Sequence, residues 1–79
     1  MKLKSATKLY KRLARANLEP RLEHRLDTDN AASYEIEVLG SSGWMTRSDL
    51  SRLLKLLDSF DEAGELEIDL RPDMPLRVR

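Results

Sequence analysis

The 79-residue sequence contains no cysteine, which excludes a disulfide framework and a thiolate metal site. Its apolar runs are only a few residues long, against the roughly 20 residues that a membrane-spanning helix needs. The opening Met1-Lys2-Leu3-Lys4 is not followed by the apolar core of a signal peptide. We therefore expect a cytoplasmic protein with no membrane span.

Residues suited to catalysis are also scarce. His24 is the only histidine, and without a second histidine or a cysteine it cannot complete a familiar metal-ligand set. The sequence has neither a phosphate-binding P-loop nor a G-x-S-x-G nucleophile elbow. The acidic residues are strung along the chain instead of converging in one loop, as a hard cation requires. We expect no enzymatic activity, no metal and no cofactor.

The length indicates one domain spanning residues 1–79. A chain this short buries only about 60 to 65% of the surface that its unfolded form exposes. Its core is therefore thin, and a homodimer is one way to enlarge it.

The charges are segregated along the chain, although fourteen basic and fourteen acidic residues balance. Residues 1–25 contain eight basic and two acidic side chains, whereas residues 26–79 contain six basic and twelve acidic ones. The molecule is therefore expected to be electrically lopsided.

Hydrophobic periodicity predicts a helix and a hairpin in the first half. Apolar residues recur at steps of three and four over residues 6–17, with Ser5 as N-cap, and the helix ends before Pro20. Residues 21–26 and 33–38 then alternate between apolar and polar side chains, as strands with one wet face do. Placing Leu26 opposite Tyr34 puts Arg25 opposite Glu35 and pairs opposite charges.

The second half repeats this order. Thr46 and Asp49 resemble a capping box with Asp in place of Glu, and they predict the start of a second helix. Its expected buried stripe consists of Leu50, Leu53, Leu54, Leu57 and Phe60. Alternation over residues 65–70 and 76–79 predicts a second hairpin, in which Leu70 faces Leu76 and Asp69 faces Arg77.

These elements give the order αββαββ and an α+β fold. Each strand has one apolar face, so the simplest assembly is a four-stranded antiparallel sheet with two helices on one face. A ferredoxin-like βαββαβ fold would show this order if its chain were circularly permuted, with the first strand moved to the end. That comparison rests on topology and leaves the strand order open.

A basic stripe is the first candidate binding site. Lys8, Lys11, Arg12 and Arg15 follow steps of three and four, which places all four cations on one face of the first helix. Such a face attracts polyanions, because each neutralised phosphate releases counterions. The alternative is a solvated helix face whose cations favour the C-terminal end of the helix dipole.

Two further candidates concern the rest of the chain. An acidic patch could contact a basic protein or imitate a phosphate backbone; its members are Asp58, Asp61, Glu62, Glu65, Glu67 and Asp69. The alternative is that these acids keep the hairpin soluble and that Glu67 and Asp69 pair with Arg77 and Arg79 within the chain. Trp44, the only tryptophan, is expected either to cover the edge of the core or to anchor a partner interface.

The sequence therefore favours a non-catalytic binding module that docks nucleic acid or a nucleoprotein complex through its basic helix face. The alternative is a protein–protein inhibitor or adaptor that blocks a surface, of the kind that phages and mobile elements encode against host or defence complexes. The motivation for the alternative is a small, dipolar, charge-rich chain without catalytic residues.

Overall fold

The computed structural model describes residues 1–26, 32–60, 66–71 and 74–79. It contains two helices and four strands in the predicted order: α1 (Leu3–Arg15), β1 (Pro20–Leu26), β2 (Ala32–Val38), α2 (Arg47–Phe60), β3 (Ile68–Asp69) and β4 (Leu76–Val78). The predicted α+β class is confirmed. No helix in these residues has both the length and the apolar composition to cross a membrane.

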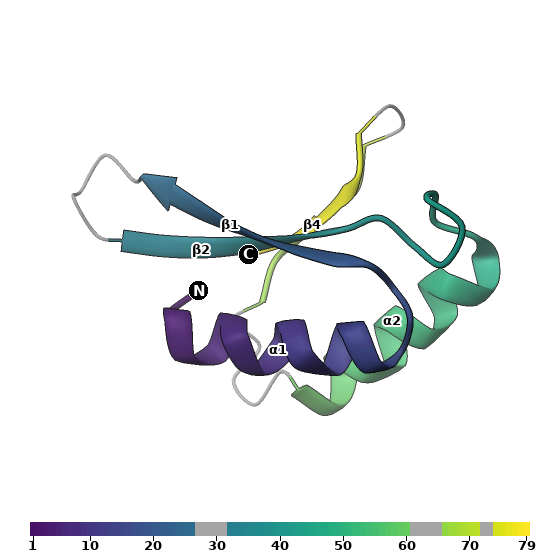
Figure 1. Cartoon of the computed structure of the whole chain (residues 1–79), viewed down its shortest axis with the longest axis horizontal. Helices are drawn as coiled ribbons and strands as arrows, with labels where there is room; N and C mark the ends of the chain where they lie inside the picture. The colour runs from purple at the N-terminus through teal and green to yellow at the C-terminus, as the bar shows by residue number, and fades with distance from the viewer. Residues whose placement is uncertain (27–31, 61–65, 72–73) are drawn as a thin grey trace.

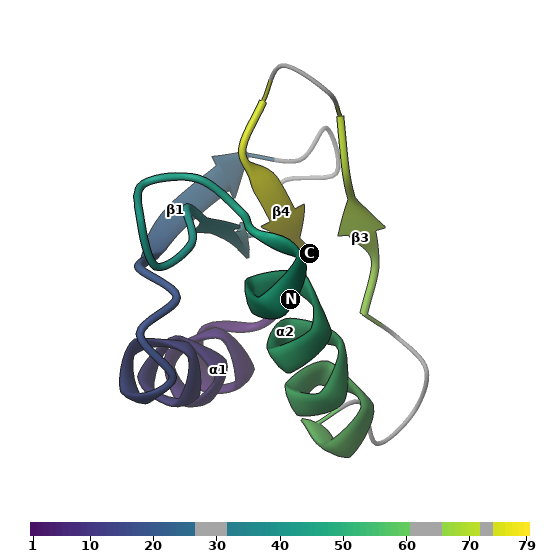
Figure 2. The same cartoon turned by 90° about the vertical axis from the view of Figure 1, so that its right-hand side faces the viewer.

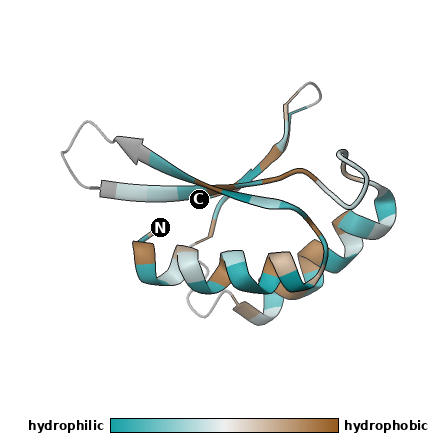
Figure 3. Cartoon of the chain, in the orientation of Figure 1, coloured by the Kyte–Doolittle hydropathy of each residue, from teal (hydrophilic) through white to brown (hydrophobic). Residues whose placement is uncertain are grey.

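The strands form one antiparallel sheet in the order β1-β2-β4-β3. Both helices lie on the same side of this sheet (Figures 1 and 2). Hydrophilic and hydrophobic positions alternate along the helices, as amphipathic elements require (Figure 3). The core between the layers consists of Leu9, Leu13, Leu18, Ile36, Val38, Leu53, Leu57, Leu76 and Val78. The predicted single helical layer over one sheet face is therefore confirmed.

The two ends of the chain meet beside β2. Tyr34 donates a backbone hydrogen bond to the Met1 carbonyl at 2.8 Å, and the Met1 amine donates to the Tyr34 carbonyl at 2.9 Å. This contact lies two residues along β2 from the pair Ile36 and Val78, so Met1 continues the line of β4 (Figure 1). A permuted ferredoxin-like chain would join its ends at this place, and that relationship stays a hypothesis of topology.

Helix α1 begins earlier than predicted and ends by a Schellman motif. It starts at Leu3 after Lys2, without a side-chain cap, and Ser5 lies inside the first turn. At the other end Asn17 adopts φ 59°, and the Leu18 N–H donates to the Leu13 carbonyl at 3.1 Å. This geometry buries Leu18 in the core and turns the chain toward β1.

The predicted register of the first hairpin is wrong by two residues. His24, and not Leu26, lies opposite Tyr34, and Arg25 faces Ser33 instead of Glu35. A shift of two residues keeps every side chain on its own face of the sheet, so the apolar pattern cannot distinguish the two registers. In the second hairpin Asp69 faces Arg77 and Ile68 faces Val78, which confirms the predicted register.

Candidate nucleic-acid interface

The basic helix face consists of Lys8, Lys11, Arg12 and Arg15. The buried side chains of α1 are Ala6, Leu9 and Leu13. The helical repeat of 100° per residue places Lys8, Lys11 and Arg15 on the opposite side and Arg12 beside them on the flank. Lys8, Lys11 and Arg15 are exposed, and Arg12 is partly buried. The predicted stripe is therefore brought together on one surface of the structure.

None of these four cations makes an ion pair with a carboxylate in the described residues. In contrast, the guanidinium groups of Arg52, Arg71, Arg77 and Arg79 each bond a carboxylate. Within the described part, no acidic residue from the second half of the chain pairs with these cations. Such pairing would have removed the proposed docking surface.

Phe60 from the last turn of α2 supports two of these cations. The Arg12 guanidinium carbon lies 5.3 Å from the centroid of the Phe60 ring, and the Lys8 ammonium nitrogen lies 6.0 Å from it. A cation over an aromatic face gains electrostatic attraction without losing its charge. Phe60 therefore positions one edge of the basic helix face, a role that the expected buried stripe of the second helix did not reveal.

The cations of α1 are not needed to cap the helix. The carbonyls of Leu13 and Ala14 accept hydrogen bonds from Leu18 and Asn17, and Arg52 of α2 donates to the Ala16 carbonyl. These bonds satisfy C-terminal carbonyls that basic side chains of the last turn often cover. Capping therefore does not account for the clustering of Arg12 and Arg15.

The open face of the sheet carries an ion-pair network instead of aromatic platforms. Arg77 bonds Glu37 at 3.2 Å and lies 3.8 Å from Glu35. Arg79 bonds Glu35 at 3.1 Å and Asp69 at 3.1 Å. These five side chains are 12 to 26% exposed, so they shield one another from water. Over β2, β3 and β4 the described charges of this face are therefore engaged in pairs with one another.

The predicted acidic patch is not assembled as a free surface in the described residues. Asp69 forms ion pairs with Arg79 and Arg71, so its charge is neutralised within the chain. Asp58 and Glu67 are exposed, and they belong to different elements, α2 and the segment before β3. Asp61, Glu62 and Glu65 lie outside the described residues.

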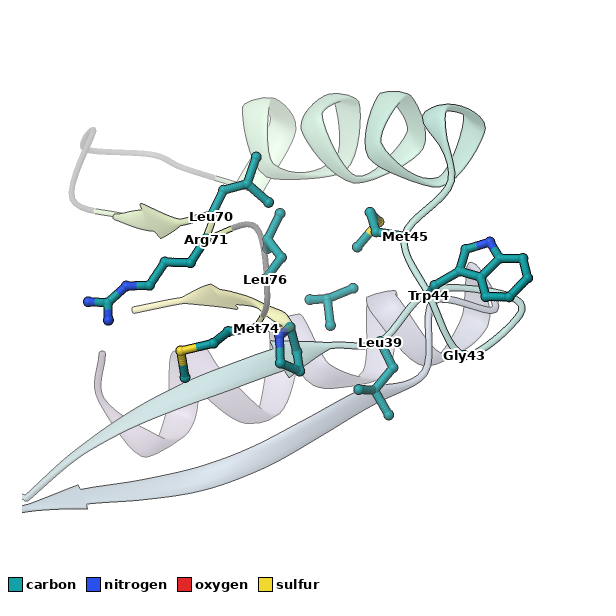
Figure 4. A pocket seen from close by; sticks show the side chains of 10 residues that line it. Leu39, Gly43, Trp44, Met45, Leu70, Arg71, Met74 and Leu76 are labelled. Carbon is teal, nitrogen blue, oxygen red and sulfur yellow. The ribbon is translucent and has the colours of Figure 1, made fainter.

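Trp44 does not cover the core, because 68% of its surface is exposed. It stands at the rim of a groove of about 680 Å³ between the loop 39–46 and the second hairpin. In Figure 4 the indole points away from the groove, while Leu70 and Arg71 lie at the far side. The sequence left two positions open for Trp44, over the edge of the core or exposed at the surface, and the structure has the exposed one.

Asp49 fixes the loop that presents Trp44. Its carboxylate accepts hydrogen bonds from the Ser41 N–H and hydroxyl, both at 3.0 Å, and from the Thr46 N–H at 3.1 Å. The Asp49 N–H donates to the Thr46 hydroxyl at 3.1 Å, so the predicted capping box is confirmed. Burial alone would raise the pKa of Asp49, but hydrogen bonds from Ser41 and Thr46 outweigh it and hold the pKa well below its usual value.

His24 is exposed and contacts Tyr34 in a tilted arrangement, with ring centroids 5.1 Å apart and an interplanar angle of 57°. No three His, Asp or Glu side chains among the described residues gather as a metal site would require.

Comparison of the chain with protein-family models, with curated proteins and with solved structures gives no match.

Proposed function

We propose that the chain is a non-catalytic module that binds nucleic acid through the basic helix face of α1. The observation that supports this most is that Lys8, Lys11, Arg12 and Arg15 share one face and make no ion pair within the described residues. On the sheet, Arg77 and Arg79 are paired with carboxylates and so contribute to the fold. The four cations of α1 make no such pair within the described residues, so their clustering is not explained by folding alone. A cytoplasmic location would give the protein access to such a partner.

The binding is expected to be electrostatic and independent of base sequence. Phosphate contacts by Lys and Arg release condensed counterions, and the affinity then falls steeply with salt concentration. The open face of the sheet carries charged pairs where base-stacking sheets carry aromatic side chains. The phosphate backbone, and not the exposed base, is therefore the expected ligand surface.

Fluorescence anisotropy with labelled DNA duplexes and single-stranded RNA, measured over a salt series, tests the proposal. Four phosphate contacts predict a slope of log affinity against log salt of about −3.6 on duplex DNA. The variant Lys11→Gln/Arg15→Gln removes two exposed cations from the basic helix face and should make the slope shallower by about 2.

A matched control removes the same charge elsewhere. Arg47 and Lys55 are exposed cations of α2, so Arg47→Gln/Lys55→Gln changes the net charge equally while leaving the basic helix face intact. This control should keep the slope of the unmodified chain. No binding at low salt, or equal losses in both double variants, would refute a specific role for α1.

The exposed Trp44 favours a second candidate, an adaptor or inhibitor that docks a protein. Tryptophan is enriched at the energetic centres of protein interfaces, and this residue borders a groove that Leu70 and Met74 also line. A protein partner should shift the emission of this single tryptophan, and Trp44→Ala should abolish its capture. Capture that nuclease removes would instead indicate that nucleic acid bridges the two proteins.

A further inference from the structure

Three exposed leucine or isoleucine side chains belong to α2 and to the β3 region, and β3 lies on the side of α2 away from α1 (Figure 2). Ile68 and Leu70 of the β3 region are 43% and 62% exposed, and Leu54 of α2 is 46% exposed. Leu54 follows Arg52 by two residues, or about 200° around the helix, and Arg52 contacts α1. Leu54 therefore points to the side of α2 where Figure 2 shows β3. We call Leu54, Ile68 and Leu70 the apolar flank.

This flank contradicts part of the sequence-based expectation. Leu54 was expected in the buried stripe of the second helix, and Ile68 and Leu70 on the inward face of a strand. The strand positions do face the helical side, because Ile68 lies opposite the buried Val78. They belong to the region of β3, which lies at the edge of the sheet and has β4 as its neighbour on one side only. Side chains patterned for burial are thus left without cover.

The backbone of β3 is open toward the same side. Glu67 exchanges both backbone hydrogen bonds with Arg79, at 3.0 and 2.9 Å. In an antiparallel ladder the bonded positions alternate, so the N–H and C=O groups of Ile68 and Leu70 point away from β4. An edge strand with outward-pointing backbone groups and apolar side chains is a template for another strand.

Most of the charges along this edge are complementary between two copies. If two copies of β3 pair antiparallel about a two-fold axis at Asp69, Glu67 faces Arg71 of the other copy. Ile68 then faces Leu70 of the other copy, and both are the positions whose backbone groups point outward. At the axis Asp69 faces Asp69 of the other copy, and each is bonded by Arg71 and Arg79 of its own chain. Over residues 67–71 this register therefore has two unlike charge pairs and one like pair, whereas a register centred on Ile68 would place Glu67 opposite Asp69 twice and have no unlike pair.

We propose that a second copy of this chain binds the apolar flank, with β3 pairing antiparallel to β3 of the partner about Asp69. The joined sheet would contain eight strands, and the apolar flanks of the two copies would cover each other on its helical side. Such two-fold contacts use the same patch on both copies. They also enlarge a core that is thin in a chain of this length.

Sedimentation of the purified chain without nucleic acid, from about 1 μM to about 1 mM, should show a monomer–dimer equilibrium. Leu70→Lys should weaken the dimer about ten-fold or more, while the thermal melt of the dilute protein changes little because this side chain is already exposed. The control Leu22→Lys places the same charge at a partly exposed site on β1, the opposite edge, and should leave the dimer intact.

Cysteine substitution tests the register in a chain that has no cysteine of its own. Asp69→Cys would face itself across the axis at a Cα separation of about 4.5 Å, within the range of a disulfide. Glu67→Cys would lie about 13 Å from its counterpart and should not crosslink. Because Asp69 is ion-paired, the melt of its reduced variant checks folding, and Leu70→Lys serves as the independent test. A monomer at all concentrations, loss of the dimer only in Leu22→Lys, or equal crosslinking by both cysteines would overturn the proposal.

Discussion

Replacing Gly40 by alanine tests the loop that presents Trp44. Gly40 adopts φ +94°, and a Cβ atom built on it would lie 2.0 Å from the Trp44 carbonyl oxygen and 2.6 Å from its carbonyl carbon. Real Cβ atoms do not approach a backbone atom so closely, so the chain at Trp44 has to move. Gly43 has a similar backbone conformation, φ +81°, but a Cβ there meets open space. The two glycines form a matched pair.

The expected magnitudes follow from this difference. A left-handed conformation costs a non-glycine residue about 1 to 2 kcal/mol, and both variants incur this cost. Only Gly40→Ala also displaces the loop whose residue Ser41 donates two hydrogen bonds to the Asp49 carboxylate. Hydrogen bonds to charged groups contribute about 1.5 to 3 kcal/mol each. We expect a loss of about 1 kcal/mol for Gly43→Ala and about 3 kcal/mol or more for Gly40→Ala.

Thermal unfolding followed by circular dichroism measures the difference. For a domain of this size 1 kcal/mol lowers the Tm by roughly 4 to 8 °C, so Gly40→Ala should melt about 8 to 16 °C below Gly43→Ala. Equal shifts in the two variants would show that the close approach of Gly40 to Trp44 is absent in solution.

Three further substitutions address other contacts. Asn17→Gly should raise stability by about 0.5 kcal/mol and Asn17→Ala should lower it by about 1 kcal/mol in urea titrations, because Asn17 adopts φ 59°. Asp49→Asn should be less stable than the parent at neutral pH. The folded pKa of Asp49 is lowered, so this difference should be present above pH about 4 and shrink as the pH falls further. Glu35→Gln should cost about 1 to 2 kcal/mol in the same titrations, since Glu35 accepts from Arg79 and is only 14% exposed.

Local signals in the sequence were sufficient for the elements and for the clustering of four cations on one helix. The period of the apolar residues predicted both helices and all four strands, and Thr46 with Asp49 marked the start of α2. The steps between Lys8, Lys11, Arg12 and Arg15 predicted a shared helix face. Each of these features depends on residues close together in the chain, where helix and strand geometry alone determines direction.

Features that depend on distant contacts could not be predicted in this way. The contact of Phe60 with Arg12 requires the crossing of α1 and α2. The pairing of Arg77 and Arg79 with Glu35 requires β4 to lie beside β2, and the sequence leaves that strand order open. Alternation likewise cannot say that β3 lies at the edge, where an inward-facing Leu70 remains exposed.

The two proposed surfaces lie on opposite sides of α2, because α1 and β3 flank it from different directions (Figure 2). A dimer that forms at β3 would therefore leave the basic helix face of each copy open to solvent. The Leu70→Lys monomer should then keep the salt dependence of its binding to a short duplex that accommodates one copy. On a longer duplex the parent should bind more tightly than this variant, because two linked basic faces raise the effective concentration of the second contact. A change of the salt slope on the short duplex would mean that the two surfaces are not independent.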